Sequence, residues 1–174
     1  MPAPALSGWY EACGASGMKL TTTWNQKMRL TAEAGGLTTS MDAKAPIGES
    51  SALTPKEHLL AAACECKAMD VLALLRKYRQ PLDAFAVEAD AKVSEGTHPT
   101  VFESLLLTFR LRGAIDRDRA LEAMRLSQTR FCGVNAMLSK AFPIRYEVFV
   151  NGEPIGDRKS TRLNSSHGYI SYAV

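Results

Sequence analysis

The chain has 174 residues, of which 46% are hydrophobic and 22% charged, and its formal net charge is +3. This composition is typical of a globular protein and excludes a disordered, collagen-like or coiled-coil chain. The basic residues are scattered, and no apolar run approaches the roughly 20 uncharged residues of a membrane span. We therefore expect neither a nucleic-acid partner nor a membrane partner.

Four cysteines stand at irregular positions: Cys13, Cys64, Cys66 and Cys132. They are too few for the disulfide framework of a small secreted protein. This cysteine usage favours a cytoplasmic location, in which the thiols are normally reduced.

The two ends of the chain differ in character from the middle. Residues 1–17 show neither helical nor strand periodicity, and we expect a non-native or disordered extension there. Residues 157–174 are polar and aperiodic, and their string KSTRLNSSH resembles translated sequencing-adaptor DNA. We expect this tail to be adaptor-derived, which leaves one domain over residues 18–156.

Three short strands are expected at the start of this domain, because hydrophobic and polar residues alternate there and turn residues separate the runs. They cover residues 18–24, 28–34 and 37–42. Their close spacing predicts a meander.

A long helix is expected next. Thr54, Pro55 and Glu57 form a capping-box pattern, and Pro81 ends the helix near residue 80. Its middle is apolar on nearly every face, which is typical of a helix buried in the centre of a protein.

The remaining elements alternate between strands and helices. Strands are expected over 85–93, 101–112 and 144–150, with one helix from Asp116 or Asp118 to about residue 129 and another over 134–141. The order is βββ-α-ββ-α-α-β, so we predict an α+β fold with an antiparallel sheet.

Two of the cysteines lie within the long helix. Cys64 and Cys66 are two residues apart, so their side chains diverge by about 200° and cannot bond to each other. No C-x-x-C or H-x-x-x-H pattern completes a zinc site, and we expect neither a metal nor a cofactor. Buried cysteine is also a common small hydrophobic residue, so inert packing stays open for both.

Two segments of the sequence resemble the OsmC/Ohr family. In the first, TPKEHLLAAACECKAMDV, Pro55 starts the helix, Cys66 follows eleven residues later, and Ala68-Met69-Asp70 comes after it. In the second, LSQTRFCGVNAML, an aromatic residue precedes Cys132 and a hydrophobic helix follows. The resemblance covers about residues 18–150.

The resemblance implies an OsmC-like fold, an intertwined homodimer and a thiol-dependent peroxidase that acts on small organic hydroperoxides. Carried over to this chain, Cys66 is the peroxidatic nucleophile and Cys132 is the resolving thiol. An external dithiol then reduces the disulfide between them.

One position departs from the family's peroxidase branch, in which a glutamate directly after the proline holds an arginine against the cysteine. Lys56 occupies the glutamate position and Glu57 comes one step later. Glu57 is therefore a candidate catalytic residue as well as a capping-box acid. Arg29, in the second strand, is the candidate arginine, and Lys56 could supply the positive charge instead.

Two alternatives to a peroxidase stay open. One is an OsmC-fold redox sensor or binding protein, in which the cysteines react without significant turnover. The other is a purely structural dimer, in which Cys66 is an unperturbed buried thiol.

Overall fold

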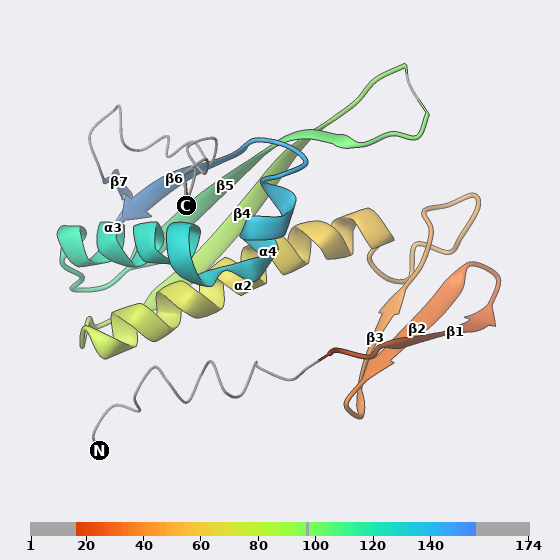
Figure 1. Ribbon diagram of the computed structural model, residues 1–174, viewed down its shortest axis with the longest axis horizontal. Coiled ribbons are helices and arrows are strands. Elements are labelled where there is room, and N and C mark those ends of the chain that lie inside the picture. The colour runs from red at the N-terminus through yellow and green to blue at the C-terminus, as the bar shows by residue number, and fades with distance from the viewer. Residues whose placement is uncertain (1–16, 97, 156–174) are drawn as a thin grey trace, which may run out of the picture. The chain divides into compact units, whose positions relative to one another are not determined.

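The computed structural model describes residues 17–96 and 98–155 (Figure 1). The elements are β1 (Thr21–Gln26), β2 (Arg29–Ala34), β3 (Leu37–Met41), α2 (Pro55–Lys77), β4 (Ala84–Val93), β5 (Phe102–Arg112), α3 (Arg117–Leu126), the π-helical turn η1 (Ser127–Phe131), α4 (Gly133–Leu138), β6 (Ile144–Val150) and β7 (Glu153–Pro154). The expectations for the first 16 residues and for the tail at 157–174 lie outside the described residues.

The first of two compact units ends at Leu59 and contains the meander β1-β2-β3. All its strand pairs are antiparallel. β1 begins three residues later than expected, at Thr21, which pairs with Glu33. Pairing of Lys19 or Met18 would need β2 to continue beyond Ala34, but the chain turns there through two glycines with positive φ.

The start of α2 is fixed by the predicted capping box. The Thr54 hydroxyl accepts from the Glu57 backbone N–H at 3.3 Å, and the Glu57 carboxylate accepts from the Thr54 backbone N–H at 2.7 Å. Glu57 also forms an ion pair of 3.0 Å with Lys44. The Thr54 N–H and Lys44 lower the pKa of Glu57 to about 2.

The helix α2 ends at Lys77, earlier than expected, because Arg79 adopts a left-handed φ of 55° and the Gln80 N–H bonds back to the Leu75 carbonyl. Only one side of α2 is buried in this chain, and Met69 is 62% exposed on another side. The expectation of burial on nearly every face is therefore corrected for the single chain. Among the described residues, no helix is long and apolar enough to cross a membrane.

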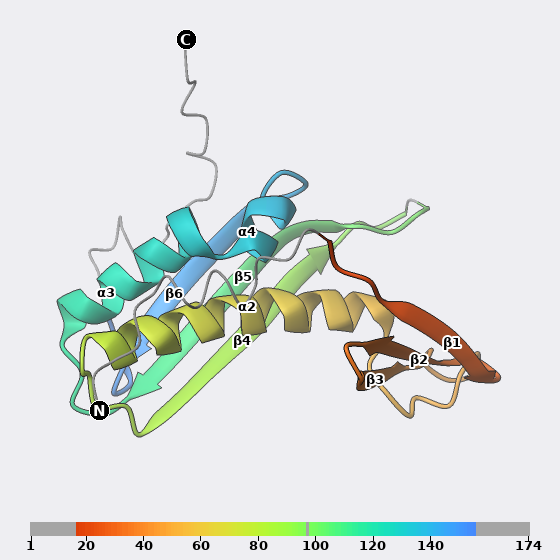
Figure 2. The ribbon, with the colours of Figure 1, turned by 60° about the horizontal axis from the view of Figure 1, so that its bottom comes forward.

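The second compact unit begins at Leu60 and contains a sheet with the strand order β4-β5-β6-β7. Alternate residues of β5 and β6 are buried, and they join residues of α2 and α3 in one hydrophobic core. In two views, α2 and α3 lie side by side against the long strands (Figures 1 and 2).

One strand pair departs from the predicted antiparallel arrangement, because β5 and β6 are parallel. The chain leaves the end of β5, passes through α3, η1 and α4, and returns to the end of the sheet at which β5 begins. A crossover of this kind is what a parallel pair requires. The other pairs in this sheet are antiparallel.

Candidate functional site

Cys66 and Cys132 are brought together by the second unit. Their sulfurs are 2.9 Å apart, although the residues are separated by 66 positions in the sequence. Cys66 is half-buried, whereas Cys132 is only 3% exposed. The expected pair of thiols is therefore adjacent in space, and Cys66 is the more accessible of the two.

The position of Cys132 is set by the break between η1 and α4. Cys132 is the N-cap of α4, with the extended backbone angles φ −74° and ψ 100°. Its sulfur accepts a hydrogen bond from the Asn135 backbone N–H at 3.3 Å. This N-cap geometry holds the sulfur over the first turn of α4, within 2.9 Å of the Cys66 sulfur.

Buried polar groups hold this break in place. The Asn135 amide donates to the Gln128 carbonyl at 3.2 Å and accepts a hydrogen bond from the Tyr146 hydroxyl. On the other side, the Ser127 hydroxyl donates to the Asp70 carboxylate at 2.9 Å. These bonds connect the turn that carries Cys132 to both β6 and α2.

Asp70 completes a cluster around the two sulfurs. It lies one helical turn after Cys66, and residues four apart share a helix face. The two sulfurs and an Asp70 carboxylate oxygen all lie within 4.8 Å of one another. Burial raises the pKa of Asp70, whereas the Ser127 hydroxyl and the charge of Lys67 act in the opposite direction.

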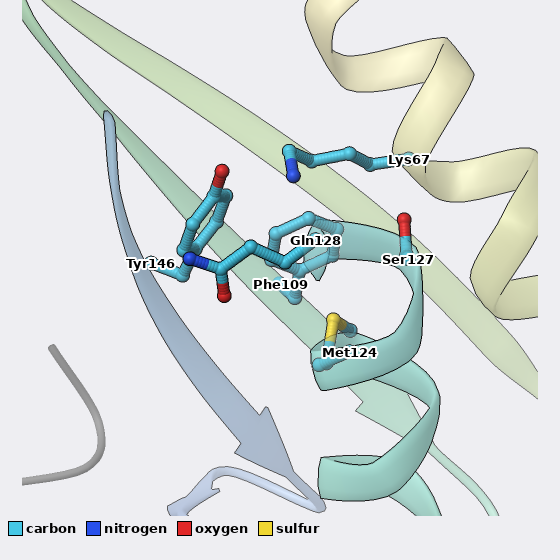
Figure 3. Close-up of a pocket in the computed structure, with 6 residues that line it drawn as sticks. All are labelled: Lys67, Phe109, Met124, Ser127, Gln128 and Tyr146. Atoms are coloured by element: carbon cyan, nitrogen blue, oxygen red, sulfur yellow. The ribbon is translucent and has the colours of Figure 1, made fainter. Parts of the chain in front are cut away.

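Lys67 is a buried cation beside this cluster, and its side chain is only 2% exposed. Its Nζ lies 4.2 Å from the centroid of the Tyr146 ring, which it faces across a small pocket (Figure 3). Burial lowers the pKa of Lys67 to about 8, while the charges of Cys132, Cys66 and Asp70 favour its protonated form. The same electrostatic attraction favours negative charge on the sulfurs.

Cys132 has a strongly shifted pKa. Burial and the neighbouring Cys66 raise the pKa of Cys132 to about 12, against the Asn135 N–H and the charge of Lys67. Cys132 is therefore a protonated thiol near neutral pH.

The pocket beside Lys67 is lined by residues from five elements: Lys67, Phe109, Met124, Ser127, Gln128 and Tyr146 (Figure 3). The side chains of Phe109 and Met124 make part of its wall apolar. Lys67 brings a positive charge to the same space. The pocket therefore combines an apolar wall with a cation that also acts on the two sulfurs.

The other two candidates, Glu57 and Arg29, lie in the first compact unit. Glu57 occupies the capping box described above, and Arg29 is an exposed residue at the start of β2. Their proposed action on Cys66 remains a prediction.

Sequence reasoning missed Lys67, although a signal was present. Lys67 follows Ala63 by four residues and precedes Val71 by four, and both neighbours are buried. A lysine at this spacing lies on the buried side of the helix, where a charge needs a specific partner.

Comparison with known proteins agrees with this fold. A model of the family described as OsmC-like protein matches residues 48–147, which is more than half of the chain. Protein YhfA of Escherichia coli (strain K12) is 36% identical over 98 residues, which cover 55% of this chain and 72% of YhfA.

Two solved structures have the same fold. A hypothetical protein from Aquifex aeolicus VF5 aligns with a TM-score of 0.70 at 19% identity, over 79% of this chain and 98% of that chain. A Legionella pneumophila structure described as an organic hydroperoxide resistance protein OsmC aligns with a TM-score of 0.55 at 13% identity, over 79% of this chain and 98% of that chain. With the family match and the identity to YhfA, the chain belongs to the OsmC-like protein family.

Proposed function

We propose that this chain is a cysteine-based peroxidase that reduces organic hydroperoxides. The observation that carries the proposal is the 2.9 Å separation of the Cys66 and Cys132 sulfurs beside the buried Lys67. Membership of the family, and the likeness to a structure described as an organic hydroperoxide resistance protein, support it.

The first step is the attack of the Cys66 thiolate on a peroxide oxygen. A sulfur–oxygen bond forms, the oxygen–oxygen bond breaks, and the remaining oxygen takes a proton and leaves as an alcohol. Cys66 is assigned this role because it is more exposed than Cys132. Lys67 stabilises the thiolate by its charge, since a nearby cation favours the ionised form of a thiol.

The second step joins the two sulfurs. Cys132 attacks the sulfenic acid on Cys66, a disulfide forms, and the oxygen leaves as water. The short distance between the sulfurs means that this step needs only a small movement. An external dithiol then restores both thiols by exchange.

The test is the consumption of cumene hydroperoxide in the presence of a dithiol and a metal chelator. We expect turnover by the wild type, none by Cys66→Ser, and normal turnover by Cys64→Ser, a matched control two residues away. Equal peroxide loss in wild type and Cys66→Ser would contradict the proposal. Stoichiometric oxidation of Cys66 without turnover would identify a redox sensor instead.

Two variants distinguish the candidate cations. Lys67→Met should slow the alkylation of Cys66 near neutral pH by about tenfold, equivalent to about 1.4 kcal/mol of lost charge stabilisation. If Arg29→Met slows alkylation and Lys67→Met does not, Arg29 supplies the positive charge. Under that outcome we propose that Glu57 holds the Arg29 side chain against Cys66, and Glu57→Gln should slow the alkylation of Cys66 as well.

We also propose that two copies of the chain form the intertwined homodimer. Several large apolar side chains are exposed in the single chain, including Trp24 at 67%, Leu37 at 79% and Met69 at 62%. Exposed apolar surface of this kind is typical of a protein interface. Light scattering after gel filtration should give twice the mass of the chain, and a monomer would contradict the proposal.

A further inference from the structure

We propose that the reduced site also binds one thiophilic divalent cation, such as Zn²⁺, through the sulfurs of Cys66 and Cys132 and the carboxylate of Asp70. The three ligand atoms lie within 4.8 Å of one another. They come from α2 and from the break before α4, so no local spacing in the sequence reveals the set.

The donor types fit zinc. Zinc binds thiolate sulfur at about 2.3 Å and carboxylate oxygen at about 2.0–2.2 Å, and three protein ligands with a water molecule form a common tetrahedral site. Two sulfurs on one zinc ion are about 3.8 Å apart at these bond lengths. The present 2.9 Å separation must therefore widen by about an ångström, which small side-chain rotations can provide.

The charge of the surroundings also fits. Zn²⁺ displaces one proton from each thiol, and with two thiolates and one carboxylate the assembly carries a net charge of −1. A buried charge needs a partner. Lys67 is buried, and its charge already interacts with all three ligand residues, so it supplies that partner.

The Asp70 ligand is held in place before a metal arrives. The Ser127 hydroxyl donates to its Oδ2 at 2.9 Å. Groups that hydrogen-bond to a metal ligand orient it and raise its affinity for the metal. Ser127 therefore acts as a positioning residue.

Metal binding would regulate the peroxidase, and this consequence rests on the proposed function. A bound cation occupies the sulfur of Cys66 and blocks its attack on peroxide. In the opposite direction, the two metal-free thiols lose two electrons and two protons as they form a disulfide, and the hydroperoxide takes both to give alcohol and water. The disulfide offers no thiolate ligand, so the oxidised site does not bind the cation.

The experiment measures metal binding in the absence of peroxide, so its failure is distinct from failure of the peroxidase. The parent carries Cys13→Ser and Cys64→Ser, which leaves Cys66 and Cys132 as the only thiols. Zn²⁺ is titrated into the reduced parent against a chromogenic chelator, and Cd²⁺ is followed by its thiolate charge-transfer absorption. We expect one equivalent of each metal to bind.

Substitution of the ligands tests their identity. Cys66→Ser and Cys132→Ser should each weaken Zn²⁺ binding by about 100-fold, and Asp70→Asn by at least about tenfold. Asp90→Asn, at an exposed aspartate on β4, is the matched control and should bind as the parent does. The oxidised parent should not bind.

Three results would overturn the proposal: no stoichiometric binding, an affinity unchanged in Asp70→Asn, or binding that survives oxidation. Circular dichroism checks that each variant is folded. Should a variant fail to fold, the unsubstituted site still provides a test, because bound Zn²⁺ must block the alkylation of both Cys66 and Cys132. Alkylation of either at its metal-free rate would overturn the proposal.

Discussion

Oxidation of the chain should raise its stability by a predictable amount. If peroxide links Cys66 to Cys132, the new bond closes a loop between residues that are 66 positions apart. The chain-entropy relation for a loop of this length gives a stabilisation of about 4 kcal/mol at 25 °C, because the unfolded chain loses conformational freedom.

The assay is urea unfolding of the oxidised and the reduced protein at one protein concentration, with a chelator in both samples. With a urea dependence of about 2 kcal/mol per molar, typical of a small protein, 4 kcal/mol corresponds to a midpoint about 2 M higher in the oxidised form. Cys64→Ser should show the full increase, since Cys64 lies outside the pair. Cys66→Ser and Cys132→Ser should show none.

One result would refute the reasoning directly. If the wild type is fully oxidised, as judged by the loss of free thiols, but unfolds at the same urea concentration as the reduced form, the bond does not close the predicted loop. A disulfide-linked dimer in non-reducing electrophoresis would refute it as well, because the two sulfurs that meet here belong to one chain.

Three further substitutions test the fold and the groups around the site. The folded-state pKa of Glu57, about 2, lies below its ordinary value of 4.5, so its stabilisation is present above pH 4.5 and is lost as the pH falls through 2. Glu57→Gln should therefore lower stability at neutral pH, by a difference that shrinks toward pH 2 in urea unfolding; a constant difference would contradict this. Phe109 is 1% exposed and packs between the rings of Phe85 and Tyr146. Phe109→Ala should therefore lower the free energy of unfolding by about 3–5 kcal/mol. A decrease below about 1 kcal/mol would show that neighbouring residues fill the cavity left by the ring. Tyr146→Phe removes the hydroxyl that donates to Asn135 and should cost about 1–2 kcal/mol by thermal unfolding, whereas unchanged stability would mean that this bond contributes nothing net.

Elements set by local chemistry were predicted well from the sequence. The capping box at Thr54 and Glu57 fixes the start of α2. Asp116 and Asp118 were the two predicted starts of the next helix. Asp116 is the N-cap of α3, because its carboxylate accepts a hydrogen bond from the Arg119 backbone N–H. Alternation of apolar and polar residues located β4, β5 and β6, because alternate residues on each strand are more buried than their neighbours.

Features that depend on distant contacts were not predicted. The parallel pairing of β5 and β6 follows from the path of the crossover, and no local pattern encodes it. Met137 lies in α4 and is apolar, but it is 65% exposed, so the apolar sequence of this helix does not by itself locate its buried face.

The candidate site was predicted only in part. The two cysteines could be proposed by resemblance to a family. Lys67 was missed despite its four-residue spacing from Ala63 and Val71, because a single lysine in an apolar helix is usually interpreted as a solvent-exposed residue. Its burial depends on Tyr146, which lies 79 positions further along the chain on β6.

The position of Cys132 relative to α2 depends on the number of residues in the π-helical turn Ser127–Phe131, which directly precedes it. Such a turn contains about one residue more per turn than an α-helix. Removing one residue from it would let α3 continue as a regular helix and rotate whatever follows by about 100° around the helix axis. Relatives with a deletion at this point would keep both cysteines in their sequences but would hold the second one on the wrong side of the helix. Alignments across the family should therefore compare the length of this turn before they equate the cysteine that follows it.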